Sequence, residues 1–526
     1  MIARFMLQWK AVKRRICTIA TTLCLALAGC SKPAQPRPEA PRADAPLQPE
    51  AAPAILFSRS QIADLQRRIQ DEPHATTWRH IVERADAYLH PRSRLYADPG
   101  DVLATGGDQA RRARQQQRRI GHLAAWMETL GPAWHLTGER RYADHATRLL
   151  TAMVEAMPVG ETTVIGSKVH HLNKAVFLRG LGMGLDLFGE RLSTAQRKRV
   201  ASAAREHLED MLSRENLWRN PPGNHRSVAI SGAGILALAL RNDFPAYSRT
   251  RTLDCQRLLR QWIEFTLDEE GGYIEGVGYL GYAMHHHAVF ADGLRRIHGI
   301  EQFEHPHVAA TPGFVAMSLL PGSDATEARN SAWYLKQFLS PWMKRIAVVN
   351  GDGLAAWLWQ RRRRPGMDYI LSERTAEEGR GESFQRITWA PAPAPVAPAE
   401  ACGLFRRHPK RGLYIWRSGW KSDDLMFSIE AGPYFAGHAQ ADRGHFNLFA
   451  YGRKWSLDSG YDKTLRRGDR GQGGAHSVVQ IDGRSQAKAG GGRGVEGQVV
   501  DWHDGERVGY VMMDLTPAYN RYQQLF

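Results

Sequence analysis

Three segments of this 526-residue chain combine residue types that can move protons or neutralise charge. The first runs Asn220-Pro-Pro-Gly-Asn224-His225-Arg226-Ser227, where the prolines and glycine force a turn and Asn224 is predicted to cap the following helix. His225, in the first helical turn, can act as a general acid or base near neutral pH, and the Asn224 amide can hydrogen-bond to an anion. Taken alone, the segment is explained better as an ordinary helix start.

The second segment, residues 269–282, carries Tyr273, Glu275, Tyr279 and Tyr282 between glycines. Its Gly276-Val-Gly-Tyr-Leu-Gly281 run matches the dinucleotide pattern GxGxxG, but no strand or βαβ context precedes it, so a nucleotide site is excluded. The following run, 285–287, consists of three histidines at consecutive positions, which cannot share one helix face. A metal cluster there is not expected.

The third segment begins Gly437-His438-Ala-Gln440-Ala-Asp442 and continues to His445, with Asp458 and His476 further on. If its first part is a strand, residues 438, 440 and 442 alternate onto one face, and His445 lies on the other unless a bulge intervenes. Solvent-facing polar strand residues would explain this motif, read alone, equally well.

Hydrophobic periodicity predicts a helical region that must position the first two segments. The expected helices cover 120–137, 139–156, 172–190, 194–214, 224–241, 251–267 and 280–298, and capping boxes begin at Ser58 and Ser193. Beyond the proline-rich stretch 390–398, strand-like runs follow at 412–416, 425–429, 446–451 and 476–481. We therefore expect an all-α domain over 55–389 and an all-β domain over 390–526, together an α+β multidomain chain. The chain stops at Phe526 without a closing tail, which suggests a β domain cut short.

The N-terminus predicts export. Residues 1–29 carry five basic residues and no acid, followed by the apolar run 16–27, which is too short to anchor a membrane. The ending Leu27-Ala-Gly-Cys30 resembles the lipobox of bacterial lipoproteins, which implies lipidation at Cys30 and an envelope location, expected at the outer membrane facing the periplasm. A plain secretory signal remains the alternative. Residues 30–54, rich in proline and alanine, predict an extended tether.

Composition narrows the partners. With 43% hydrophobic and 24% charged residues the chain is ordinary globular material, not a polytopic membrane protein. Its formal charge of +16 favours a polyanionic partner, and five of the basic residues belong to the signal. Export disfavours nucleic acid and leaves an acidic polysaccharide or membrane. Without the signal cysteines and Cys30, only Cys255 and Cys402 remain, so at most one disulfide is possible.

In order and spacing, the segments together resemble the heparinase II/III-like polysaccharide lyases, alginate lyases among them, from about residue 56 onward. The resemblance rests on Asn224-His225, the Glu-Gly-x-Gly-Tyr segment and Gly-His-x-x-x-Asp…Asp-x-Gly-Tyr. It implies an incomplete (α/α) toroid followed by an antiparallel β-sandwich, with a cleft between them. The implied activity is cleavage of a uronate-containing polysaccharide by β-elimination, with no required cofactor.

The resemblance also implies residue roles. The catalytic set is Asn224, His225, Tyr279 and His438, and the candidate substrate-binding residues are Arg226, Tyr273, Glu275, Tyr282 and the arginines of 111–119. Asp458 and His476 look like two ligands of the structural zinc that some members carry. The third ligand of that pattern is Gln440 here, and amides are poor zinc ligands.

Two other functions stay open. A glycoside hydrolase on the same toroid would need two carboxylates flanking the bond, for which Asp268 and Glu275 are available. A non-catalytic polysaccharide-binding lipoprotein would keep the binding residues and tolerate loss of Tyr279. The order Asn-His, Tyr, His fits elimination better than hydrolysis. The sequence leaves the uronate, the mode of attack and the oligomeric state open.

Overall fold

The computed structural model describes residues 51–100, 109–157, 170–213, 223–329, 341–361, 383–432, 438, 440–456, 458, 460, 473–486 and 496–519. All of them belong to one compact unit, Leu47–Phe526. The predicted signal segment, most of the tether and Cys30 lie outside the described residues. No described helix is long and apolar enough to cross a membrane.

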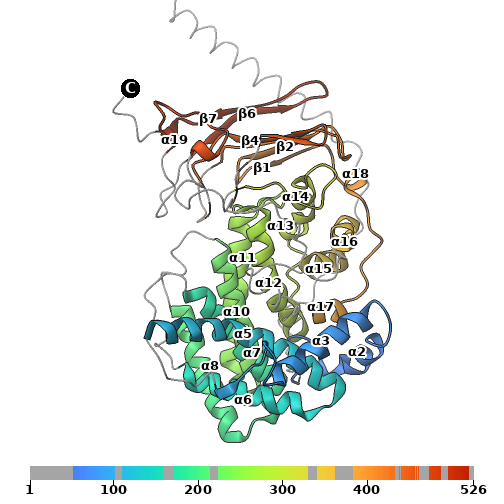
Figure 1. The fold of residues 1–526 in the computed structure, drawn as a ribbon, viewed down its shortest axis with the longest axis vertical. Coiled ribbons are helices and arrows are strands. Elements are labelled where there is room, and N and C mark those ends of the chain that lie inside the picture. The colour runs from blue at the N-terminus through green and yellow to red at the C-terminus, as the bar shows by residue number, and fades with distance from the viewer. Residues whose placement is uncertain are drawn as a thin grey trace, which may run out of the picture. The chain divides into compact units, whose positions relative to one another are not determined.

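The helical region comes first along the chain (Figure 1). Its longer helices are α3 (His74–Leu89), α5 (Gln109–Thr137), α6 (Arg140–Ala156), α7 (His170–Phe188), α8 (Thr194–Ser213), α10 (Asn224–Ala239), α11 (Pro245–Thr266), α12 (Gly276–His298) and α15 (Pro341–Asn350). The shorter ones are η1 (Arg59–Gln61), α2 (Ile62–Arg68), η3 (Gly189–Arg191), η4 (Leu240–Asn242), α13 (Pro306–Ala309), α14 (Thr311–Met317), α16 (Gly353–Gln360), α17 (Ser383–Thr388) and α18 (Pro398–Ala401).

Helix α10 forms the centre of the helical region. It packs against α7, α11 and α12, and nearly all of its residues are buried. Small residues allow the close approach: a Cβ at Gly232 would overlap the backbone of Ala175 on α7. Because α10 begins at Asn224, this packing fixes the position of the Asn224-His225 pair.

The predicted helices all exist, and their starts follow local signals. The capping box at Ser58 is formed, and at Ser193 the backbone N–H donates to Gln196 Oε1 at 3.0 Å. Four of the helices begin earlier than predicted, α7 by two residues and α5, α11 and α12 by four or more. Helix α5 starts at Gln109 because 109–119 is rich in helix formers that lack apolar periodicity, and α11 starts at Pro245, a residue suited to a first helical turn.

The β region forms two antiparallel sheets. A five-stranded sheet has the order β1 (Phe405–His408), β2 (Leu413–Arg417), β3 (Met426–Glu430), β4 (His445–Ala450) and β5 (Arg453–Ser456). A second sheet pairs β6 (Gln498–Asp504) with β7 (Gly509–Asp514); a short 3-10 turn, η6 (Gly473–Ala475), and the helix α19 (Thr516–Tyr519) complete the described elements. The predicted strand at 476–481 is wrong, because only an isolated bridge at Ile481 is present. The described residues before β4, 438 and 440–444, are not a strand either, so the alternation expected there does not apply.

The two sheets stack as layers (Figure 1). Trp502 of β6 stacks on Phe405 of β1, with ring centroids 5.4 Å apart, and Asp504 accepts a 3.0 Å hydrogen bond from the indole of Trp416. The five-stranded sheet is also tied to the helical region, since the Arg406 guanidinium donates to the carbonyl of Glu270 at 2.9 Å. The predicted architecture, a helical toroid followed by a β-sandwich, is therefore confirmed.

Candidate functional site

Three aromatic side chains from distant parts of the sequence meet at one place. Tyr279, in the first turn of α12, stacks on His438 with ring centroids 3.7 Å apart and an interplanar angle of 10°. His225, in the first turn of α10, stands edge-on to His438 at 6.5 Å. All three are partly exposed. The structure thus brings together three of the four residues predicted to be catalytic, two from helix starts and one from the β region.

The fourth, Asn224, precedes His225 in the chain and is held by hydrogen bonds to Glu275. The backbone N–H of Asn224 donates to Glu275 Oε2 at 2.6 Å, and its side-chain Nδ2 donates to the same oxygen at 2.9 Å. Tyr273 adds a third hydrogen bond from its hydroxyl, also at 2.9 Å. Glu275 therefore fixes the amide group of Asn224 in one orientation.

The preceding residue must be glycine for this arrangement. A Cβ at Gly223 would lie 2.7 Å from Glu275 Oε1, too close for the carboxylate to remain in place. The carbonyl of Gly223 also accepts a 3.0 Å hydrogen bond from the Trp262 indole. The start of α10 is thus built around the carboxylate of Glu275.

Two predicted substrate-binding residues have a different role. Tyr273 and Glu275 are buried, with 0% and 2% exposure, and their polar atoms face Asn224 and each other. This contradicts the prediction that they bind substrate directly. Tyr282 lies one turn beyond Tyr279, partly buried and edge-on to His286 at 5.3 Å. Arg226 follows His225 on α10 and is half-buried. The side chains of 111–119 lie outside the described residues.

A buried charge cluster supports the site from the β region. Glu430 of β3 accepts hydrogen bonds from Arg411 at 2.9 Å and Arg443 at 3.0 Å. Burial opposes its ionisation, but these two guanidinium groups and that of Arg329 lower the pKa of Glu430 to about 2. Arg411 also donates to the carbonyl of Tyr273 at 3.2 Å. The segment carrying Glu275 is therefore anchored to the sheet.

Burial keeps His438 in its neutral form. Burial lowers the pKa of His438 from its ordinary 6.5 to about 4. Its imidazole is therefore neutral at pH 7 and offers a lone pair rather than a positive charge. A neutral imidazole can act as a general base under those conditions.

The two carboxylates considered for hydrolysis are both buried. Asp268, fully buried, accepts the backbone N–H of Gly272 at 2.7 Å and lies 3.6 Å from the buried His408. Glu275 holds Asn224, as described above. Neither carboxylate faces the Tyr279–His438 pair in the contacts of the described residues.

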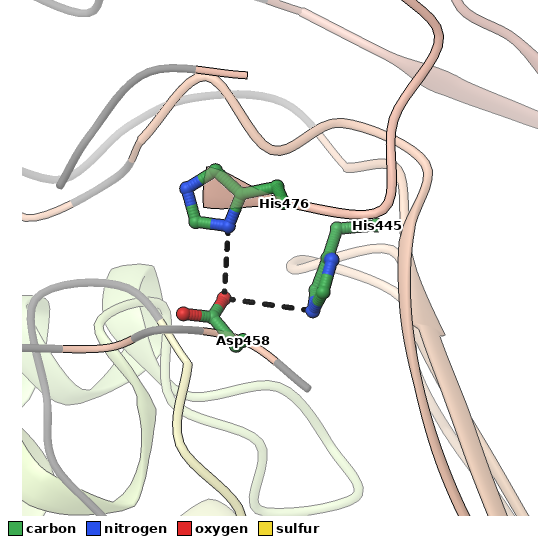
Figure 2. A group of neighbouring side chains, drawn as sticks. All are labelled: His445, Asp458 and His476. Carbon is green, nitrogen blue, oxygen red and sulfur yellow. Dashed lines mark ion pairs between the residues drawn. The ribbon is translucent and has the colours of Figure 1, made fainter. Parts of the chain in front are cut away.

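A separate cluster of potential metal ligands lies in the β region (Figure 2). His445, Asp458 and His476 have ligand atoms within 4.8 Å of one another, with Asp458 Oδ2 3.8 Å from His445 Nε2 and 3.6 Å from His476 Nδ1. Two of the three were predicted from the sequence. The third member, His445, begins β4 and was not expected from the family pattern, whose third position is Gln440.

Comparison with known proteins bears on the β region first. Residues 403–523 match the family described as heparinase II/III-like, C-terminal. The C-terminal region is therefore similar to the heparinase II/III-like C-terminal domain. The resemblance inferred from the sequence is thereby confirmed. An alginate lyase from Stenotrophomonas maltophilia strain K279a is 26% identical over 176 residues, 32% of this chain. That match spans 24% of the length of the curated relative.

Solved structures share the fold over most of the chain. A heparinase III with methylated lysines matches with a TM-score of 0.54 at 15% identity, over 88% of this chain and 73% of that one. The heparan sulfate lyase HepC from Pedobacter heparinus matches with a TM-score of 0.51 at 16% identity, over 86% of this chain and 69% of that one. At these identities the likeness establishes the toroid and sandwich alone.

Several residues that shape the site were not predicted. Arg411, Arg443 and Asn447 read as ordinary β-region polar residues, and their burial at 2%, 1% and 1% gives them their importance. For the two arginines, the available signal was their partner Glu430, a carboxylate directly after the strand-like run 425–429, because buried charges need partners.

Proposed function

We propose that this chain is a polysaccharide lyase that cleaves a uronate-containing polysaccharide by β-elimination and leaves an unsaturated uronate. The proposal rests on one observation: Asn224, His225, Tyr279 and His438 converge, with Tyr279 and His438 in direct ring contact. The heparinase II/III-like domain and the named lyases among the similar proteins support the same class of reaction.

The reaction removes the proton at C5 of the uronate and expels the oxygen at C4. The C5 proton is weakly acidic and the adjacent carboxylate is already negative, so the enzyme must stabilise the extra charge that develops there. Nδ2 of Asn224 carries two hydrogens, and one of them is directed to Glu275. The other is available to the substrate carboxylate. Asn224 is buried, so this contact requires the site to widen when the polysaccharide enters.

Proton transfer is assigned to the stacked pair. Tyr279 donates its phenolic proton to the departing O4. When the C5 proton and O4 lie on opposite faces of the sugar ring, the neutral His438 or His225 accepts the C5 proton. When they lie on the same face, Tyr279 serves as both base and acid. The ring contact with His438 keeps the Tyr279 hydroxyl in one place for either route.

Hydrolysis is the weaker alternative. A glycosidase needs two carboxyl groups that reach the scissile bond from either side. Asp268 and Glu275 are 0% and 2% exposed, and both are already engaged by protein donors. A non-catalytic binding protein would not require a tyrosine and a neutral histidine in ring contact, so catalysis accounts for more of the geometry.

The net positive charge supports the proposed class of substrate, and the N-terminal sequence supports the proposed location. The basic excess of the chain suits an acidic polysaccharide. The Leu27-Ala-Gly-Cys30 sequence supports a lipid anchor at Cys30 in the bacterial envelope, with the enzyme at the outer membrane facing the periplasm. Globomycin treatment of expressing cells, which blocks lipoprotein signal cleavage, would cause the uncleaved form to accumulate.

One assay separates the three functions. The protein is incubated with alginate, hyaluronan, heparan sulfate and glucuronan, while chain length and the ultraviolet absorbance of the unsaturated uronate are both followed. Cleavage with rising absorbance supports elimination. Cleavage without absorbance would instead indicate hydrolysis, and binding without cleavage would indicate the binding protein.

A further inference from the structure

The His445–Asp458–His476 cluster resembles a zinc site, and the hydrogen bonds of His445 decide whether it can be one (Figure 2). A histidine binds a metal through a ring nitrogen that has no proton. Its other ring nitrogen then carries the proton and donates it to a carbonyl, a carboxylate or water. The partners of the two nitrogens therefore reveal whether His445 is free to ligate.

The Nδ1 atom of His445 faces a donor. The backbone N–H of Ser477 donates to it at 2.9 Å. A peptide N–H cannot accept a hydrogen bond, so Nδ1 carries no proton. In the neutral ring the proton must then be on Nε2, the atom nearest to Asp458.

The Nε2 atom faces an acceptor, which confirms the same tautomer. The side-chain oxygen of Asn447 lies 3.1 Å away and also accepts the backbone N–H of Asp458 at 2.7 Å. The amide of Asn447 cannot be turned around, because its nitrogen donates to Glu327 Oε2 at 2.8 Å and to the carbonyl of Ala328 at 3.3 Å. His445 therefore donates from Nε2 and has no lone pair directed at the cluster centre.

The remaining donors are too few for a structural zinc ion. His476 fits a metal, since both of its ring nitrogens are buried without a hydrogen-bond partner in the described structure, and Asp458 offers Oδ2. Protein zinc sites use three or four protein ligands. With His445 engaged, the histidine and carboxylate side chains of the described cluster supply two, and the amide of Gln440, at the third position of the family pattern, is a poor zinc ligand. These residues therefore do not fit a structural zinc.

His445 and Asn447 instead make the connections that a metal would make. Through them β4 is bonded to the segment at Asp458, to the loop at Ser477 and to the helical region at Glu327. The same loop is held a second time where Gln486 pairs with the backbone of Arg443, at 2.9 and 2.7 Å. We infer that the hydrogen bonds of His445 and Asn447 hold β4, Asp458 and the loop at Ser477 together, and that the stability of this part of the β region does not depend on zinc.

The His445→Gln variant shows whether His445 serves as a zinc ligand or through its hydrogen bonds. Its glutamine side chain can accept from Ser477 and donate to Asn447 but is a poor zinc ligand. Phenylalanine fills similar space and can do neither. The zinc content of the purified full chain and its Tm with and without EDTA are measured for the wild type, His445→Gln and His445→Phe.

We expect no stoichiometric zinc in the wild type and no change of Tm with EDTA. His445→Gln should stay near the wild-type Tm, whereas His445→Phe should lose on the order of 5 °C, because it leaves buried polar groups unpaired. One zinc per wild-type chain, or a Tm that falls in EDTA, overturns the inference. So does an equal loss of Tm in both variants. None of these readouts depends on lyase activity.

Discussion

The phenol of Tyr279 lies nearly parallel to the imidazole of His438, 3.7 Å away between ring centroids. One ring belongs to the helical region and the other to the β region, so their contact exists only when both regions are folded together. Under the proposed mechanism, this contact places the proton donor next to a neutral base.

Removing only the hydroxyl of Tyr279 tests its role as the acid. Tyr279→Phe retains the ring and its stacking on His438 but cannot deliver a proton to O4. We expect kcat to fall by about 10³-fold or more, with substrate affinity nearly unchanged. The matched control is Tyr510→Phe, an exposed tyrosine of β7 that has no assigned role at the site. A Tyr279→Phe enzyme with a near-normal rate would show that another group supplies the proton.

The pH profile tests the state of His438. Its pKa is lowered by burial to about 4, so the base form predominates above that pH and is lost as the pH falls through it. We expect kcat to stay level from pH 7 to about 5 and to decline below, with rates measured after brief exposure to acid. An acid limb centred near the ordinary histidine pKa of 6.5 would contradict the burial of this base.

Glu275 is expected to act as a positioning residue for Asn224. Glu275→Gln keeps an oxygen that can accept from the Asn224 amide, whereas Glu275→Ala leaves both Asn224 donors unpaired. We expect kcat/KM to fall by about 10²-fold in the alanine variant and by much less in the glutamine variant. Circular dichroism checks that both variants fold. If both lose activity equally, the negative charge itself is needed and positioning is not the explanation.

Salt tests the charge contribution to substrate binding. Screening weakens attraction between an anionic polysaccharide and exposed basic residues, with a Debye length of about 8 Å at physiological ionic strength. KM should therefore rise with added NaCl while kcat stays constant. Arg226→Gln should raise KM at low salt and flatten its dependence on salt. A wild-type KM that is insensitive to salt would mean that binding relies on neutral hydrogen bonds.

Local signals in the sequence predicted the helical frame well. Helix α10 begins close to where it was expected, because prolines and a glycine precede a long apolar run, but its N-cap is Gly223 and the predicted cap, Asn224, is the first helical residue. The contact between Asn224 and Glu275 could not be read in this way, since it joins side chains 51 positions apart that meet only through the packing of α10 and α12. A carboxylate in such a segment looks the same in sequence whether it binds substrate or holds another side chain.

The β region was harder to predict for a physical reason. Side-chain alternation locates a face only within a continuous strand, and β4 begins at His445, after the segment to which the alternation was applied. His445 was therefore expected on the face opposite His438 and Gln440, and its place beside Asp458 and His476 was missed. The family pattern places its third ligand at Gln440, a poor zinc ligand, and gave no sign that His445 would join the cluster.

Three arginines of the β region donate hydrogen bonds to backbone carbonyls of the helical region. These bonds limit which foreign β region could replace the native one. Arg406, Arg411 and Arg417 donate to the carbonyls of Glu270, Tyr273 and Leu319. Carbonyl groups are present at every position whatever the side chain, so the helical partner needs only the right backbone path. A chimaera with a foreign β region should keep its active site only if the incoming region carries arginines at these three positions. A chimaeric gene can therefore be joined within the proline-rich stretch 390–398, but its protein product keeps the active site only when these three hydrogen bonds form.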